Sequence, residues 1–298
     1  MKYLVQTTAI AACVAFTLGA QTRDRGRSFN LNTQGHGETC ADLQVTSRDG
    51  EIARSSDKVT LGSNEASGIE LNTADHASIQ VRGWNQSSYQ VETCKIAVAA
   101  DRGTADQALA AIAVTHSGGR FSYTGPEKSD SNWQVYFIIH TPANARLDLE
   151  TRNGPVSVSG VNGNIKLRAG NGPLAIKNTT GNVDAQTQNG PISFEGESGD
   201  VHLHANNGPI SVKVAKDAWN GTALEAATEN GPVSLNVPST FRTGVRIESS
   251  RHSPVSCRMC TTENDGDGNR VMRMNGSSDT IRVSTHNGPV SVGSGKAL

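Results

Sequence analysis

An Asn-Gly-Pro triplet recurs through the second half of this chain, and its first four copies are 18 residues apart. Gly163, Gly181 and Gly199 lie midway between these copies, so the underlying period is nine residues. A short, strict period with glycine-marked turns is typical of a solenoid, in which each repeat contacts only its neighbours. The copies are Asn153-Gly154-Pro155, Asn171-Gly172-Pro173, Asn189-Gly190-Pro191, Asn207-Gly208-Pro209, Asn230-Gly231-Pro232, Asn287-Gly288-Pro289 and the degenerate His252-Ser253-Pro254.

Apolar and polar residues alternate after each of these corners, which is the pattern of a half-buried β-strand. The other half of each repeat shows the same alternation, as at Ile165/Leu167 and Val183/Ala185. Two strands per repeat predict a mainly β protein, in which residues 144–298 form a two-sheet parallel β-solenoid with coils of about 18 residues. The inward pairs that follow the corners are Val156/Val158, Leu174/Ile176, Ile192/Phe194, Ile210/Val212, Val233/Leu235 and Val290/Val292.

Each corner residue has a separate structural task. Gly supplies a backbone that a Cβ atom would obstruct, and Pro presets φ at the start of a strand. The Asn side chains can satisfy the turn, and stacked copies predict an amide ladder along the solenoid. We therefore interpret the corners as structural, with ligand binding by the Asn side chains as the alternative; the residues concerned are Asn153, Gly154, Asn171, Gly172, Asn189, Gly190, Asn207, Gly208, Asn230, Gly231, Asn287 and Gly288.

The amino terminus has the features of an export signal. Lys2 precedes an apolar stretch over residues 9–20, which is too short to span a bilayer, so we predict a signal peptide over residues 1–20. Attachment of a lipid at Cys13 is the alternative. The polar, arginine-containing residues 21–38 are expected to form a disordered tether.

Residues 39–143 are less regular and predict a smaller β-rich module. One helix is expected over residues 104–116, with Thr104 as its cap, covering a face or an end of the sheets. In the solenoid, the long spacing before the last corner predicts a hairpin-like insertion at residues 258–279, with its strands at 260–263 and 270–274.

Several segments resemble the bacterial putative-adhesin family of Gly-punctuated β repeats, whose domain is largely of unknown function. The resemblance covers residues 40–298 and rests on the corners, the helix beginning at Thr104 and two motifs, Ile79-Gln80-Val81-Arg82-Gly83-Trp84 and Pro142-Ala143-Asn144-Ala145-Arg146-Leu147-Asp148-Leu149. Many members carry Gly or Asp where this chain has Pro. The resemblance implies an envelope or extracellular β-solenoid, and it brings no catalytic residues.

Cysteine usage predicts an oxidising compartment. Four cysteines remain once Cys13 is removed with the signal peptide, and they allow three pairings. We favour disulfides Cys40–Cys94 and Cys257–Cys260. A zinc or redox site at Cys257 and Cys260 with His252 would need at least one further ligand.

Two other clusters have some features of metal sites. Residues 265–269 begin like a calcium loop, but Arg270 and Gly276 occupy positions that need Gly and Glu. His202 and His204 share the outward face of one strand without a third ligand. We therefore predict no metal and no cofactor.

The charges nearly balance, with 27 Lys and Arg against 28 Asp and Glu, so we expect no nucleic-acid partner. Catalytic motifs are missing, and Asp148, Asp184 and Asp200 are dispersed along the chain. A column of small outward residues follows the corner prolines, with Ser157, Ser193, Ser211, Ser234 and Ser291 as the candidate docking face.

The interpretation that results is a non-catalytic exported protein, without a transmembrane segment after signal cleavage. It would be periplasmic, cell-surface or extracellular in a bacterium, and would act through its surface in adhesion or cell-envelope scaffolding. Its expected partner is a surface glycan or another envelope protein. The alternative is a carbohydrate-active β-helix enzyme, either a polysaccharide lyase or a hydrolase.

Overall fold

The computed structural model describes residues 29–34, 37–73, 75–127, 130–251, 253–264, 270–276 and 278–294. Within these residues the chain is mainly β, with one α-helix, and its strands form a twelve-stranded, an eleven-stranded and a two-stranded sheet. The signal peptide predicted over residues 1–20 lies outside the described residues.

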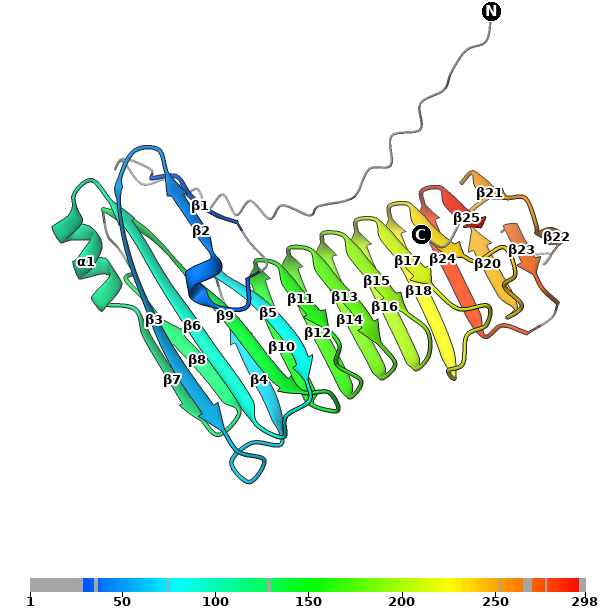
Figure 1. Ribbon diagram of the computed structural model, residues 1–298. Helices are drawn as coiled ribbons and strands as arrows, with labels where there is room; N and C mark the ends of the chain where they lie inside the picture. Colours follow the sequence, from blue (N-terminus) through cyan, green and yellow to red (C-terminus); the bar gives the residue numbers. More distant parts are fainter. Residues whose placement is uncertain are drawn as a thin grey trace, which may run out of the picture.

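The repeat region alternates between the two large sheets (Figure 1). Each strand pairs in parallel with the equivalent strand of the next repeat, so that Leu147, Ile165 and Val183 are partners in the twelve-stranded sheet. That sheet receives β10 (Arg146–Asn153), β12 (Asn164–Asn171), β14 (Asn182–Asn189), β16 (Asp200–Asn207) and β18 (Ala223–Asn230). The eleven-stranded sheet receives β11 (Val156–Ser159), β13 (Leu174–Thr179), β15 (Ile192–Gly196), β17 (Ile210–Val214) and β19 (Val233–Val237).

The apolar residues predicted to point inward form one continuous core between these sheets. Val158, Ile176, Phe194 and Val212 are direct partners across successive strands, and each is at most 1% exposed. This column confirms the register read from the repeat. Burial of a side chain of this size contributes about 1.5 to 3 kcal/mol, so the repeated column is a main source of stability.

The amino-terminal part extends the same two sheets. β4 (Gly68–Thr73) pairs in parallel with β10, and β5 (Ala77–Trp84) with β11, so both sheets run across the boundary expected at residues 143 and 144. Further strands complete this end: β3 (Glu51–Leu61), β6 (Tyr89–Ala99), β7 (Ala113–Ser117), β8 (Arg120–Thr124) and β9 (Ser131–Pro142). β3 and β7 are the last strands of the two sheets.

The helix is shorter than predicted and begins earlier. α1 spans Arg102–Ala110, because the side chain of Asp101, and not Thr104, caps it by accepting the Thr104 N–H at 2.9 Å. Residues from Ala113 onward belong to β7, so the expected range 104–116 was wrong at both ends. Ala105 packs against Ala53 and Ala99 of β3 and β6, which places α1 at the amino-terminal end of the sheets (Figure 1).

Part of the expected tether is instead ordered against the sheet. β1 (Leu31–Gln34) and β2 (Gln44–Ser47) form the two-stranded antiparallel sheet, joined through the short 3-10 helix η1 (Cys40–Asp42). Phe29 and Leu31 are buried against Ile96 and Val98 on the outward side of β6. The expectation of disorder was therefore wrong for residues 29–34, because these two side chains find an apolar partner that is distant in sequence.

The carboxy-terminal strands do not stack in sequence order. β24 (Ile281–Asn287) and β25 (Val290–Ser294) pair with β18 and β19, while the earlier β20 (Val245–Ser249) and β21 (Val255–Cys257) lie outside them. β22 (Thr261–Asn264) and β23 (Arg270–Met274) form the predicted antiparallel hairpin and continue the sheet beyond β20. The calcium-loop candidate at 265–269 lies outside the described residues.

Replacing Gly172 by Val should destabilise the protein more than replacing Ser193 by Thr. A Cβ atom on Gly172 would lie 2.8 Å from the Gly154 carbonyl carbon, whereas Ser193 is a half-exposed outward residue. We expect the two free energies of unfolding to differ by about 1 to 3 kcal/mol, measured by denaturant titration. Equal midpoints would show that the corner is not closely packed.

Candidate functional site

The corner asparagines form the predicted ladder. Asn171 Nδ2 donates to Asn153 Oδ1 at 2.7 Å, and the same bond continues through Asn189, Asn207, Asn230 and Asn287 at 2.9 to 3.0 Å. Because each amide binds the next, the arrangement supports the structural interpretation of the corners.

The ladder ends on a carboxylate. Asn153 Nδ2 donates to Asp75, which occupies the equivalent corner between β4 and β5. Every amide donates in this direction, so the negative charge of Asp75 meets the donor end of the chain of amides. This is the same sign of interaction that places carboxylates at helix amino termini. Asp75 does not stand out in the sequence, because its corner lacks the Gly-Pro that marks the others.

Both predicted disulfides are present. Cys40 is bonded to Cys94 and Cys257 to Cys260, with a Cα–Cα distance of 5.5 Å in each pair. The sulfur atoms of Cys257 and Cys260 are thus bonded to each other, and the geometry offers no support for a zinc site there. Disulfides persist in oxidising compartments, so they indicate an extracytoplasmic protein. No helix in the described part of the chain is long and apolar enough to span a bilayer.

The serine residues of the candidate docking face stand in one outward column of the eleven-stranded sheet. Ser193, Ser211 and Ser234 are partners on successive strands, and the column continues through Ser291 to Ser256 at the carboxy-terminal end. At the other end, Ser157 pairs with Gln80 of β5. Gln80 is 3% exposed, because the amino-terminal segment covers it and its Nε2 donates to the Gly37 carbonyl at 2.8 Å.

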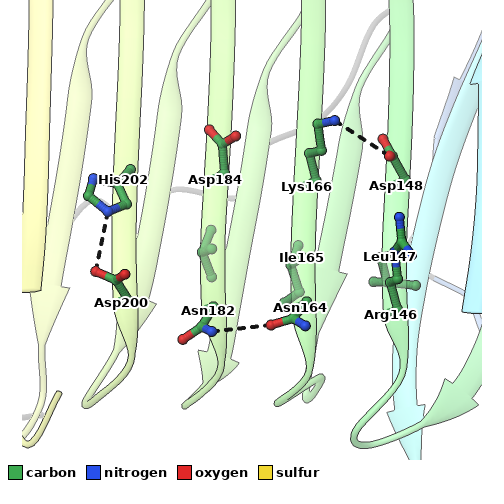
Figure 2. A pocket seen from close by; sticks show the side chains of 11 residues that line it. Arg146, Leu147, Asp148, Asn164, Ile165, Lys166, Asn182, Asp184, Asp200 and His202 are labelled. Atoms are coloured by element: carbon green, nitrogen blue, oxygen red, sulfur yellow. Dashed lines mark hydrogen bonds and ion pairs between the residues drawn. The ribbon is translucent and has the colours of Figure 1, made fainter. Parts of the chain in front are cut away.

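The outward face of the twelve-stranded sheet is charged and hollowed. A hollow of about 330 Å³ lies near the start of β10, β12, β14 and β16 (Figure 2). Lys166 Nζ lies 3.6 Å from Asp148 Oδ2, and Asn182 Nδ2 donates to Asn164 Oδ1 at 3.2 Å. The polar side chains around this hollow are Arg146, Asp148, Asn164, Lys166, Asn182, Asp184, Asp200 and His202.

A second hollow, of about 530 Å³, lies near the ends of the same strands. Arg168 connects the two hollows, since its guanidinium lies 4.0 Å from Asp184 on the neighbouring strand. Gln186 also reaches Asp184, donating from Nε2 at 2.9 Å. The polar residues around the second hollow are Asn72, Thr73, Glu150, Thr151, Arg152, Arg168, Gln186, Thr187, Gln188, His204 and Asn206.

The three aspartates that are dispersed in the sequence are gathered around the first hollow. Asp148, Asp184 and Asp200 come from β10, β14 and β16, three of the four strands that line this hollow, so residues that are dispersed along the chain face one space. This grouping could have been predicted from the repeat, because outward residues 18 positions apart become neighbours on adjacent strands. Lys166 is thus the partner of Asp184, and Arg168 the partner of Gln186, on the adjacent strands β12 and β14.

The two histidines of β16 do not converge on a common point. His202 lies between Asp200 at 3.2 Å and Glu225 at 3.3 Å, so both of its ring nitrogens face carboxylates. His204 Nε2 instead lies 3.0 Å from Asn206 Oδ1. Across the described ranges, no three His, Cys, Asp or Glu side chains are grouped so that they could hold a metal ion.

No family model matches the chain, and no curated protein matches it. Solved structures of similar architecture are a putative cell adhesion protein from Clostridium sporogenes (12% identity, TM-score 0.34, covering 80% of this chain and 99% of that one) and putative adhesins from Bacteroides fragilis (12%, 0.37, 81% and 96%) and Parabacteroides merdae (8%, 0.25, 80% and 96%). Their names agree with the family resemblance seen in the sequence. Identities and TM-scores as low as these do not indicate the function of this chain, which therefore rests on its own geometry.

Thiol titration tests the two disulfides. In exported protein that is unfolded without reduction, we expect no reaction at Cys40, Cys94, Cys257 or Cys260, because all four are paired. Prior reduction should release all four thiols and serves as the control. Four reactive thiols without reduction would contradict both bonds.

Proposed function

We propose that this chain is an exported, non-catalytic β-solenoid that acts through its surface in adhesion or in scaffolding of a bacterial cell envelope. Residues 144–298 supply the solenoid, and the amino-terminal module closes one end of it. The partner is another envelope protein or a surface glycan, met in the periplasm, at the cell surface or outside the cell. The docking face is the serine column of the eleven-stranded sheet.

One observation carries this proposal. The outward face of the eleven-stranded sheet already binds an added layer at its amino-terminal end, where residues 29–34 and 37–47 pack on β5, β6 and β9. The contact is partly polar, since Thr33 Oγ1 donates to Gln134 Oε1 at 3.0 Å. Gln80, which lies under this layer, belongs to the same outward column as the serines, and the column continues in register from Gln80 through Ser157 to Ser193. The same surface is therefore suited to receive a further partner.

The shape of the uncovered part supports docking of a flat partner. Small side chains at Ser157, Ser193 and Ser234 are half-exposed, so a partner can approach the sheet closely. A neighbouring outward column carries Lys177, Glu195 and Lys213, and Lys213 Nζ lies 2.9 Å from Glu195 Oε1. Equivalent contacts repeated on each coil sum to useful avidity even when each is weak.

A carbohydrate-active enzyme is the second candidate, and the hollow around Asp148, Asp184 and Asp200 is the observation that favours it. Glycoside hydrolases work with a pair of carboxylates across the bond to be cleaved. Here the nearest cations already engage two of the three, with Lys166 at Asp148 and Arg168 at Asp184. Release of reducing ends from a polysaccharide, abolished by Asp184→Asn, would establish the enzyme and displace the non-catalytic proposal.

The docking face is tested by placing two charges on it. The double variant Ser193→Lys/Ser211→Lys should weaken attachment of purified protein to envelope fractions of the source bacterium, because long cations on adjacent strands block close approach. Circular dichroism and melting should show an intact fold, since both positions point outward.

The matched control is Thr180→Lys/Ser198→Lys. These residues are also 18 apart, but they lie in the turns before β14 and β16 and away from the serine column. Attachment should survive in the control. If the folded serine variant attaches as well as the wild type, or if both variants fail equally, the docking face is wrong.

A further inference from the structure

The two hollows of the twelve-stranded sheet lie next to each other on the same four strands, and together they are termed the trough. Both are lined by β10, β12, β14 and β16, the first through residues near the strand starts and the second through residues two to four positions further on. Neighbouring parallel strands are about 4.8 Å apart, so four strands present equivalent side chains at regular steps along the stack. The combined space falls within the range of small-molecule sites.

The trough offers paired donors and acceptors. Amides at Asn182 and Gln186 can each donate and accept, and carboxylates at Asp184 and Asp200 accept only. Side chains of this kind bind vicinal hydroxyl groups through two hydrogen bonds at once. Among the described residues that line the trough, the imidazoles of His202 and His204 are the only rings, so recognition would run through hydroxyl groups more than through stacking.

The charges of the trough cancel. Its lining holds four basic residues (Arg146, Arg152, Lys166 and Arg168) and four acidic residues (Asp148, Glu150, Asp184 and Asp200). Several of the cations lie near a carboxylate, as at Lys166 and Asp148 (3.6 Å) and Arg152 and Asp75 (3.7 Å). A polyanion or a polycation therefore gains no long-range attraction here. A neutral ligand rich in hydroxyl groups does not need such attraction, because it would bind through hydrogen bonds.

We propose that this trough binds a neutral polysaccharide, which lies across β10, β12, β14 and β16 along the axis of the stack. The inference goes beyond the function proposed above, because it assigns a ligand class to the sheet opposite the serine column. A chain with one face on a glycan and the other on a partner would join the two, which is what a scaffold requires.

The test uses the full exported chain and three soluble neutral polysaccharides, a β-glucan, a galactomannan and a xylan, in affinity electrophoresis and calorimetry. At least one should bind, with little change in affinity between low salt and about 0.5 M NaCl. The variant Asn182→Ala/Gln186→Ala removes one amide from each hollow without changing the charge, and should weaken binding about tenfold. Thr180→Ala, in the exposed turn before β14 and outside both hollows and the serine column, is the control and should bind as the wild type does.

Three results would overturn the inference: no binding to any of the three polymers, equal binding by the amide variant, or stronger and salt-sensitive binding to polygalacturonate. Melting curves show whether the amide variant is folded, and Asp148→Ala/Lys166→Ala, which also keeps the charge balance, replaces it if it is not. Cleavage of a bound polymer would support the trough as a glycan site while refuting the non-catalytic function, so the two proposals fail separately.

Discussion

The close approach of backbones at the Asn-Gly-Pro corner is the constraint on which the rest of this structure depends. Gly172 N–H donates to the Asn189 carbonyl at 3.1 Å, and Leu174 N–H donates to the Pro191 carbonyl at 2.9 Å, so the corner itself is paired from one sequence repeat to the next. The asparagine ladder runs beside these bonds. Because a slip by one residue would turn every inward side chain outward, corners that are paired at both backbone and side chain secure the register of both sheets.

A secured register turns a repeat in sequence into two surfaces of different chemistry. On the eleven-stranded sheet, equivalent outward positions give small side chains that continue a face covered at its amino-terminal end by residues 29–34 and 37–47. On the twelve-stranded sheet, the corresponding positions differ from repeat to repeat and bring Asp148, Lys166 and Asp184 around one hollow. The strict part of the repeat thus builds the scaffold, and its variable part supplies the candidate site.

The sequence predicted what depends on local period and missed what depends on distant contacts. The inward column through Phe194 and the amide ladder followed from spacing and residue type. The disulfides were favoured among three possible pairings of four cysteines, and the structure contains them. The packing of Phe29 on Ile96 and Val98 could not be read, because no pattern connects these segments. The insertion of β24 between β18 and β20 could not be predicted either. Strands of equivalent sequence repeats can occupy the same position in the sheet, so their order depends on the packing of all the repeats together. Predicting the trough from the sequence would have required the register of all four strands that line it.

Amide hydrogen exchange at the corner glycines tests the central claim most directly. If the corners are paired as the structure has them, the N–H groups of Gly172, Gly190 and Gly208 should exchange as slowly as those of buried strand residues such as Ile192. Gly276, in an exposed turn where an added Cβ would meet nothing within 4 Å, provides the fast-exchanging reference. Exchange of the corner glycines at the rate of Gly276 would contradict the account, because the backbone hydrogen bonds that fix the register would then not form stably.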